Sequence, residues 1–467
     1  MLNMAQQNIC KNMNFNKPKL GSKDDHVNHQ YMITIKPIVI RTTLILSATC
    51  TMFNSRVFYL QQLTRSSLRS LCIQKLSESS SLYRQLKARI LATGPITVAD
   101  YMKEVLTNPT DGYYINNDVF GKNGDFITSP EISQLFGEMT GVWLVNEWQK
   151  IGSPKPFQIV EFGPGRGTLI DDILRVFKKL KLPMDQINIK LIEVSPKLSE
   201  IQEKNLCGSS SAPVLASICY KQNTTRHGSQ IGWYRQLKDV PEKFSIFLAH
   251  EFFDALPVHK FVKNEKGWRE ILVDFDREGD QFRFVVSRSS TPALKIYSKF
   301  LPASSLKEAE ISPQSILIAR DIARRIHEEG GIALITDYGH NGTKGDTFRG
   351  FRNHQLHDPL VDPGTADLTV DVDFSLIKKA VSEETDTSVL VYGPITQARF
   401  LSGLGIEQRL QRLLQNSSAE VSKDLISGYR MLTERDQMGE RFKLLAFFPK
   451  VLQDHLTKFP PVSFTCV

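Results

Sequence analysis

Short runs of apolar and β-branched residues alternate with amphipathic stretches of helical period from Leu82 onward. This alternation predicts an α/β domain with a largely parallel sheet. In an open parallel sheet the ligand crevice lies beyond the carboxyl ends of the strands, so residues that follow the strands are the first candidates for chemistry. The predicted strands are 157–162, 187–194, 244–249 and 332–336, and the predicted helices are 169–180, a segment from about 196, and 314–328.

One more helix is predicted to start at Thr128, because its spacing from Glu131 is that of a capping box and Pro130 falls in the first turn. Apolar residues then recur at helical spacing, which predicts that this helix packs on the core. These residues are Ile132, Leu135, Phe136, Met139, Trp143 and Val145.

Three stretches interrupt the alternation. Residues 207–230 are polar and rich in turn formers, which predicts a surface loop. The runs 269–276 and 281–287 flank the turn Arg-Glu-Gly-Asp and predict a hairpin. Residues 339–367 are rich in Gly, His and Asp and predict a long loop. The last hundred residues are predicted to be mainly helical.

Charge changes this picture only near the start of the sequence. The chain has 58 Lys and Arg against 50 Asp and Glu, a net charge of +8. Residues 1–77 contain ten of the basic residues and two of the acidic ones, so they account for the whole excess and the rest of the chain is neutral. A neutral body lacks the positive surface that proteins need to follow phosphates, which argues against a nucleic-acid partner.

The basic segment has the composition of a mitochondrial transit peptide. Residues 26–77 contain no acidic residue, and apolar residues from Met52 onward recur at helical spacing, which predicts a basic amphipathic helix. Because residues 1–51 do not resemble the start of a presequence, we expect initiation at Met52 or a variable extension before it. Two basic residues and a proline interrupt the competing membrane span at 31–50, so we expect no stable membrane insertion.

The strongest local signal is the turn after the first predicted strand, where glycines alternate at Gly163, Gly165 and Gly167. Glycine is needed where φ is positive or where the backbone must approach a ligand without a Cβ. A P-loop needs a Lys-Ser/Thr pair, and a dinucleotide fingerprint needs glycine at Thr168, so both interpretations fail. The remaining interpretation is an S-adenosylmethionine turn in which Glu161 receives the cofactor's ammonium. The alternative interpretation, a tight turn that binds no ligand, is left open by the sequence.

Other acidic residues follow the next strands. Glu193 ends the second predicted strand, where a carboxylate can accept bonds from both ribose hydroxyls. Glu251 and Asp254 follow strand 244–249 and share one face if this turn is helical. Two carboxylates in an apolar setting suit a guanidinium, which stays charged and offers a planar fork of donors. We therefore predict that they clamp an arginine and aim one nitrogen at a methyl sulfonium. A helix start enriched in acids for dipole reasons is the alternative.

No metal site is expected. The six cysteines form no Cys-x-x-Cys pair, which argues against a zinc ribbon, a redox site or a disulfide scaffold. His250 and Glu251 start a zinc-protease motif, but the second histidine of that motif would stand at Asp254. The histidines and aspartates within 339–367 fit a mobile active-site loop better than a metal site. Whether residues 337–340 line the crevice or only turn the chain stays open.

Many of these motifs occur in one order along roughly residues 85–450. They are G-P-I-T-V-A-D-Y-M at 94–102, D-G-Y-Y at 111–114, G-D-F-I-T-S-P-E-I-S at 124–133, V-E-F-G-P-G-R-G-T at 160–168, A-H-E-F-F-D-A-L-P-V at 249–258, I-T-D-Y-G-H at 335–340, P-G-T-A-D-L-T at 363–369, V-D-F at 372–374 and Y-G-P-I-T-Q at 392–397. Their order resembles the MidA family of class I methyltransferases, and within it the mitochondrial complex I assembly factors described as protein arginine methyltransferases.

The resemblance implies a doubly wound, Rossmann-like methyltransferase sheet with accessory N-terminal, hairpin and C-terminal helical segments. It implies S-adenosylmethionine as donor and symmetric dimethylation of an arginine in the 49-kDa-type core subunit of complex I, in the mitochondrial matrix. It places the cofactor at Gly163, Gly165, Gly167 and Glu193, whereas the acceptor role of the two acids after strand 244–249 rests on the local pattern. A non-catalytic assembly chaperone that binds S-adenosylmethionine, a small-molecule methyltransferase and a homo-oligomer stay open.

The expected organisation has four parts. Residues 1–77 are a targeting segment or extension, and 78–150 form a helical segment that covers the cleft. Residues 151–340 form the cofactor-binding core, with a hairpin insertion near 265–290. Residues 341–467 hold a substrate loop and a C-terminal helical segment.

Overall fold

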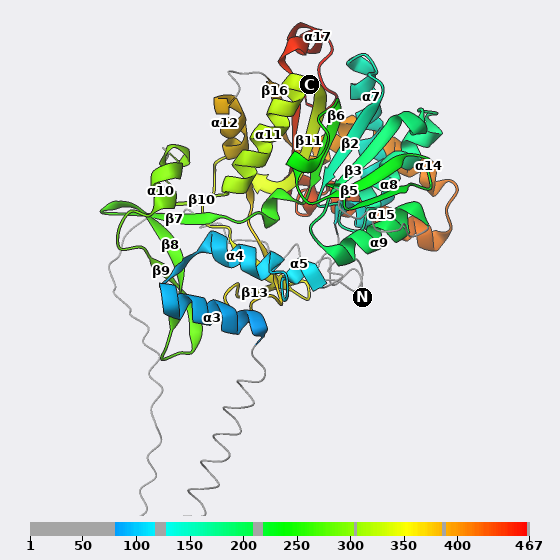
Figure 1. Cartoon of the computed structure of the whole chain (residues 1–467). Coiled ribbons are helices and arrows are strands. Elements are labelled where there is room, and N and C mark those ends of the chain that lie inside the picture. Colours follow the sequence, from blue (N-terminus) through cyan, green and yellow to red (C-terminus); the bar gives the residue numbers. More distant parts are fainter. Residues whose placement is uncertain (1–79, 117–127, 209–217, 303–305, 385–388, 465–467) are drawn as a thin grey trace, which may run out of the picture. The chain divides into compact units, whose positions relative to one another are not determined.

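The structure is a computed structural model that describes residues 80–116, 128–208, 218–302, 306–384 and 389–464 (Figure 1). The transit-peptide helix expected from Met52 and the extension before it lie outside the described residues. No helix among the described residues has an apolar stretch long enough to span a membrane.

The main sheet of the described residues has nine strands in the order β16-β17-β11-β6-β2-β3-β5-β4, with β15 beside the end of β11. The strands β11, β6, β2, β3 and β5 run parallel, and β17 lies antiparallel between β11 and β16. The doubly wound, Rossmann-like sheet is therefore confirmed. The strands are β2 (Phe157–Phe162), β3 (Ile187–Ile192), β4 (Lys221–Thr224), β5 (Gln230–Tyr234), β6 (Ser245–His250), β11 (Gly331–His340), β15 (Val372–Asp373), β16 (Val389–Thr396) and β17 (Phe442–Pro449).

Helices cover both faces of this sheet, which explains why its strands are almost continuously apolar. In β2, Ile159 faces the core formed with α7 (Gln134–Lys150) and α8 (Thr168–Lys179). The next residue, Val160, faces the opposite core, formed with α11 (Pro313–Glu329) and α12 (Phe374–Glu384). Figure 1 shows the two helix pairs on opposite sides of the sheet. The other described α-helices are α3 (Ser81–Thr93), α4 (Val98–Thr107), α5 (Tyr113–Asn116), α6 (Ser129–Ile132), α9 (Pro196–Cys207), α10 (Pro292–Tyr297), α13 (Gln397–Gly403), α14 (Ile406–Leu414), α15 (Ala419–Thr433), α16 (Met438–Arg441) and α17 (Gln453–Lys458).

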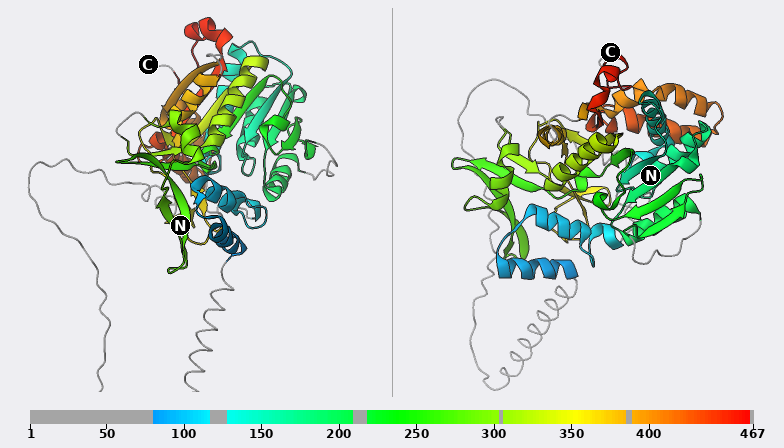
Figure 2. Two further views of the ribbon diagram at one scale, coloured as in Figure 1. Left: turned by 60° about the vertical axis from the view of Figure 1, so that its left-hand side comes forward. Right: turned by 45° about the horizontal axis from the view of Figure 1, so that its top comes forward.

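A second sheet of five strands joins segments from across the chain. The predicted hairpin is confirmed, because β8 pairs antiparallel with β9 from Asp276 opposite Gln281. The helices α3 and α4 pack against this sheet around Leu86, Tyr101 and Phe282, and Figure 2 shows them beside it in both views. The strands are β1 (Ile96–Thr97), β7 (His259–Asn264), β8 (Gly267–Asp276), β9 (Gln281–Val286) and β10 (Glu308–Ile311).

A helix starts after Thr128 with Pro130 in its first turn, as predicted, but it is not one continuous helix. The Thr128 side chain caps nothing, and α6 ends after one turn. The backbone is extended at Ser133, whose Oγ accepts from the N–H of Leu135, 3.3 Å away, and starts α7. The predicted packing of this stretch holds for Leu135, Phe136, Met139, Trp143 and Val145, which are buried.

Three predicted stretches contain strands that local patterns did not indicate. The predicted surface loop 207–230 includes β4, which pairs with β5. The predicted loop 339–367 contains β12 (Arg349–Arg352) and β13 (Gln355–His357), and β14 (Asp367–Thr369) completes their sheet. The carboxyl-terminal part is mainly helical, as predicted, but it also contains β16 and β17, which complete the main sheet. Each of these strands is short or pairs with a distant segment, so its partner could not be seen in the local sequence.

The strand β17 supplies the first prediction. Phe447 in β17 is 0 % exposed and belongs to the core under α11. Phe447→Ala should lower the free energy of unfolding by about 3–5 kcal/mol, because it removes a buried ring and leaves a cavity. Urea unfolding followed by circular dichroism measures the loss. Phe459→Ala is the control, because Phe459 is 57 % exposed and its removal should cost less than about 0.5 kcal/mol. Equal losses in the two variants would show that β17 is not a central strand.

Candidate functional site

A cavity of about 770 Å³ lies where the parallel strands of the main sheet end. Its wall includes residues that follow β2, β3 and β6, and Tyr338 of β11. Most of the residues predicted from the sequence as site residues meet here. Those in the wall are Gly163, Gly165, Glu193, Glu251 and Asp254. Glu161 and Gly167 are not among the wall residues.

The glycine turn opens onto the cavity at Gly165. Its φ is +54°, in the left-handed region, and a Cβ placed on it would meet no atom within 4 Å. The backbone is therefore bare on a side that faces open space, as a close-fitting ligand requires. Gly167 differs, because a Cβ on it would lie 3.0 Å from Leu206 of α9. Gly167 lets α9 pack against the turn, and its predicted contact with the cofactor stays a prediction.

Glu161 is buried beneath the glycine turn. It is 2 % exposed, and its Oε2 has no hydrogen-bond partner among the described residues. Burial raises the pKa of this carboxyl to about 8. A buried carboxyl with an unsatisfied oxygen is costly, so a hydrogen-bond donor or a cation supplied by a ligand would stabilise it.

Glu193 is buried at the end of β3 and lines the cavity. Its Oε1 accepts from the N–H of Ser195 at 2.7 Å, and its Oε2 accepts from Nε2 of Gln202 at 2.9 Å. Burial raises its pKa to about 7, while these two donors lower it. Each carboxylate oxygen has a further lone pair, so the group can still accept bonds from a diol.

The acidic turn after β6 starts with an unusual backbone conformation. Glu251 has φ +49°, which is uncommon for a residue with a side chain. Its N–H donates to the carbonyl of Thr336 in β11 at 3.0 Å, and its Oε1 accepts from the N–H of Ser129 in α6 at 3.1 Å. The other oxygen, Oε2, has no hydrogen bond to the described residues and lies on a side chain in the cavity wall. One oxygen of Glu251 is thus fixed by the protein and one is available.

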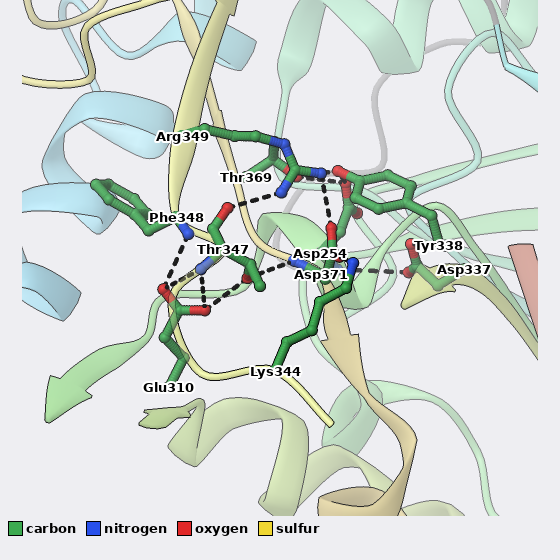
Figure 3. Close-up of polar contacts among 10 residues, drawn as sticks. All are labelled: Asp254, Glu310, Asp337, Tyr338, Lys344, Thr347, Phe348, Arg349, Thr369 and Asp371. Atoms are coloured by element: carbon green, nitrogen blue, oxygen red, sulfur yellow. Dashed lines mark hydrogen bonds and ion pairs between the residues drawn. The ribbon is translucent and has the colours of Figure 1, made fainter. Parts of the chain in front are cut away.

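Asp254 shows the same division of its two oxygens. Its Oδ2 accepts from the hydroxyl of Tyr338 and from Oγ1 of Thr369, the latter at 2.9 Å (Figure 3). Its Oδ1 is buried and has no partner among the described residues. The guanidinium of Arg349 lies 5.4 Å from the centre of the Tyr338 ring and lowers the pKa of Asp254, but burial has the larger effect and raises it. Arg349 itself is paired with Asp371 at 2.8 Å.

Asp337 holds the acidic turn in place from β11. It is 0 % exposed, and its Oδ2 accepts from the backbone N–H groups of Phe252, Phe253 and Asp254 at 3.2, 3.0 and 3.4 Å. Burial and the nearby charges of Asp254 and Glu251 raise its pKa well above the ordinary range. One carboxylate therefore fixes the direction of the backbone that carries both predicted catalytic acids.

Burial raises the pKa of Glu251 to about 8 as well. His250 lies beside it, with its Nε2 3.4 Å from Oε1 of Glu251, but burial lowers the pKa of His250 to about 3. The imidazole is therefore neutral and offers the acids no positive charge. A cluster of buried carboxyls favours a cationic ligand. The basic residues of the cavity wall are Lys103, Arg235 and Lys238.

Residues 337–340 were predicted either to line the crevice or only to turn the chain, and the structure places two of them at different cavities. Tyr338 lines the site, whereas His340 lines a separate cavity of about 330 Å³ together with Asp371, Asp373 and Lys344. The described residues contain no group of three or more His, Cys, Asp and Glu placed to hold a metal ion.

The sequence did not indicate the contacts of several residues in and around the cavity. Asp337 stands in the motif I-T-D-Y-G-H, and Ser129 stands in T-S-P-E, so both motifs were noticed without their contacts to the acidic turn. Tyr114 and Asp367 also line the cavity and are joined by a hydrogen bond of 2.7 Å. In the sequence these residues are only polar residues next to the end of a predicted strand or the start of a predicted helix. That position does not indicate which distant residue each one contacts.

The residues present fit S-adenosylmethionine. Open space over Gly165 can take part of a ligand, Glu161 offers an unsatisfied buried oxygen, and Glu193 lies in the wall where a ribose diol would bind. No phosphate-binding lysine follows the glycine turn, which agrees with a cofactor without pyrophosphate.

Comparisons with known proteins agree with this geometry. Residues 139–393 match the family model described as "Putative S-adenosyl-L-methionine-dependent methyltransferase". The chain is 51 % identical over 395 residues to the Drosophila melanogaster "Protein arginine methyltransferase NDUFAF7 homolog, mitochondrial", covering 83 % of this chain and 90 % of that one. It is 49 % identical over 376 residues to the Homo sapiens "Protein arginine methyltransferase NDUFAF7, mitochondrial", covering 79 % and 83 %.

A solved structure is also similar. A Burkholderia thailandensis protein bound to S-adenosyl-homocysteine superposes with a TM-score of 0.65 and 26 % identity, covering 80 % of this chain and 93 % of that chain. The similarity covers nearly the whole of that protein, so it extends beyond the central sheet to the accessory segments.

The bare backbone at Gly165 supplies the second prediction. Gly165→Val should abolish binding of S-adenosylmethionine, at least about a hundredfold in Kd, because a branched side chain would fill the space over the turn. Gly152→Val is the matched control, since Gly152 also has positive φ (+95°) and open space at its Cβ but lies outside the cavity wall. Isothermal calorimetry on both folded variants measures the affinity. Undiminished binding by Gly165→Val would place the cofactor elsewhere.

The backbone contacts of Asp337 supply the third prediction. Asp337→Ala should reduce methyl transfer about tenfold or more while leaving S-adenosylmethionine affinity unchanged, because only the acceptor turn loses its support. Asp373→Ala is the control, because Asp373 also accepts three backbone N–H groups, those of Gly342, Ser375 and Leu376, but lies outside this cavity. Both variants should lose similar stability, about 1–3 kcal/mol. A similar loss of activity in both would contradict a specific role of Asp337.

Proposed function

The chain belongs to the MidA family of S-adenosylmethionine-dependent methyltransferases, and on that premise we propose that it methylates an arginine side chain of a protein. The single observation that carries the choice of acceptor is the pair of carboxyls in the cavity wall, with Oε2 of Glu251 opposite the oxygen that the Ser129 N–H holds and Oδ1 of Asp254 without a partner among the described residues. Each belongs to a carboxyl whose other oxygen is fixed by the protein.

S-adenosylmethionine is the cofactor of this family, and when bound it supplies an activated methyl group on sulfur. Gly165 offers bare backbone to it beside Gly163 in the cavity wall, Glu161 offers an acceptor for its ammonium, and Glu193 offers an acceptor for its ribose hydroxyls. In-line methyl transfer from a reactive donor depends mainly on positioning, which these rigid contacts provide.

Glu251 and Asp254 would bind and orient the guanidinium. A guanidinium presents a planar fork of N–H donors to two oxygens, whereas an ammonium is a point charge without a preferred plane. Two carboxylates on one side of the fork also concentrate its positive charge there, which leaves the opposite nitrogen richer in electrons. This arrangement favours arginine over lysine as the acceptor.

The acids would also manage the proton that the acceptor nitrogen releases on methylation. Burial raises the pKa of Glu251 to about 8, and a bound guanidinium would lower it toward its ordinary range. As the cation loses its proton, the same carboxyl regains its affinity for one. Glu251 is therefore suited to accept the proton at neutral pH.

The finer proposal concerns the product and the substrate. We propose symmetric dimethylation of an arginine in the 49-kDa-type core subunit of complex I during assembly of the matrix arm. The curated relatives are named mitochondrial protein arginine methyltransferases, and the chain is a mitochondrial protein with a basic, acid-free segment at 26–77. In this proposal 151–340 binds the cofactor, 78–150 covers the cleft and 341–467 contributes to substrate binding.

Glu251→Gln supplies the fourth prediction and tests the proposed function. Methylation of matrix protein with labelled S-adenosylmethionine should fall about a hundredfold or more, because the amide cannot accept a proton and carries no charge. Calorimetric binding of S-adenosylmethionine should be unchanged. The matched control is Glu270→Gln, which changes another buried glutamate, 0 % exposed, in the second sheet.

The same variant separates the enzyme from an assembly chaperone that only binds the cofactor. A chaperone should support complex I assembly equally well with Gln at position 251, whereas the enzyme should not. Methylation of an arginine peptide but not of the matching lysine peptide is expected. Equal activity on both peptides, or transfer to small molecules alone, would contradict a protein arginine acceptor.

A further inference from the structure

Gln202 connects the two halves of the cofactor site. It lies on α9, is 0 % exposed, and does not belong to the cavity wall. Its Nε2 donates to the carbonyl oxygen of Gly165 at 2.8 Å and to Oε2 of Glu193 at 2.9 Å. One side-chain nitrogen thus bridges the glycine turn after β2 and the acid after β3.

The orientation of this amide follows from a third contact. Nε1 of Trp233 in β5 lies 2.9 Å from Oε1 of Gln202. An indole nitrogen is a donor only, so the oxygen of the amide must face Trp233 and the nitrogen must face the two acceptors. Both N–H groups and the oxygen are then used, and neither rotating the amide nor replacing it with an apolar side chain preserves the bridge.

The rest of the inner face of α9 supports the same turn. Three residues later, Nδ2 of Asn205 donates to the carbonyl of Arg166 at 3.1 Å. One residue further, Leu206 lies against Gly167, 3.0 Å from the position of a Cβ. The spacing of these residues from Gln202 puts all three side chains on one face of the helix. The helix α9 therefore supports consecutive residues of the glycine turn, and Gln202 alone extends this support to Glu193.

We propose that Gln202 is a positioning residue for S-adenosylmethionine: it holds the backbone of Gly165 and the carboxylate of Glu193 at a fixed separation, so that both contact the same ligand molecule. The proposal rests on the use of this cofactor by the chain. Gly165 is expected to contact one part of the cofactor and Glu193 its ribose. Gln202 would therefore fix the relative position of the two protein groups that hold these two parts.

Loss of the bridge would act on both groups. The carbonyl of Gly165 and Oε2 of Glu193 would lose the donor that the buried amide of Gln202 supplies, which costs free energy and loosens their spacing. Oε2 of Glu193 would lose its side-chain donor, while Oε1 would keep the N–H of Ser195. The cofactor would then have to order the site as it binds, which lowers its affinity.

Gln202→Met supplies the fifth prediction, because methionine has a similar length but cannot make the bridge. The Kd for S-adenosylmethionine and for S-adenosyl-homocysteine, measured by calorimetry, should rise about tenfold to a hundredfold. The KM for S-adenosylmethionine should rise by the same factor, while the KM for the protein substrate stays unchanged. A purely structural role would instead lower kcat through a smaller folded fraction and leave KM unaltered.

The matched control is Gln397→Met. Gln397 is also 0 % exposed and also donates to a backbone carbonyl, that of Leu432 at 2.9 Å, but it lies on α13 outside the cavity wall. The Kd of the Gln397→Met variant for S-adenosylmethionine should stay within about twofold of the Kd of the unmodified protein. If Gln202→Met does not fold, Gln202→Glu keeps the shape and should also weaken binding, because an added carboxylate faces two acceptors.

The outcomes separate this role from the proposed function. Binding by a folded Gln202 variant within about twofold of the unmodified chain would overturn the role of Gln202 alone, and so would an equal loss in Gln397→Met. Absence of S-adenosylmethionine binding by the unmodified chain would overturn the proposed function together with it. If the unmodified chain and its variants all bind the cofactor but none methylates arginine, only the proposed function is contradicted.

Discussion

The burial of several carboxyl groups at one edge of a sheet is the constraint on which the site depends. Glu161, Glu193, Glu251, Asp254 and Asp337 lie at or near the ends of four parallel strands, and Glu251 is partly buried while the other four are buried. Each would be costly as an anion in such surroundings, and together they repel one another. The protein reduces this cost with backbone N–H groups, an amide and two hydroxyls, but it leaves particular oxygens unsatisfied. A cationic ligand is the natural complement of those oxygens.

The cofactor half of this edge could be predicted from the sequence because its signals are local. A strand, an acid, alternating glycines and a helix occur within a dozen residues, and Glu193 follows the next apolar run. The acidic turn was also visible, since Glu251 and Asp254 follow a buried strand. Its shape was not, because a 3-10 turn and a positive φ at Glu251 depend on Thr336 and Asp337 from another strand.

The same reason explains the errors in the fold. The strand β17 is a continuous apolar run near the end of the sequence, and its central place depends on pairing with β11 about a hundred residues earlier. The strands β12 and β14 pair within a stretch whose Gly, His and Asp content is typical of a loop. The capping box at Thr128 failed because Ser133 offered a competing cap, and local spacing does not decide between two caps.

The acceptor half of the site is assembled from distant segments, and this difference has a functional meaning. Glu251 needs the N–H of Ser129 from the segment before the sheet, and Asp254 needs Tyr338 of β11 and Thr369 of β14. The cofactor half is complete within β2, β3, β5 and α9. The proposed cofactor site can therefore form from the sheet and α9, whereas the proposed guanidinium site also needs the accessory segments. The accessory segments thus belong to the chemistry, because without them the two acids would have neither their direction nor their available oxygens.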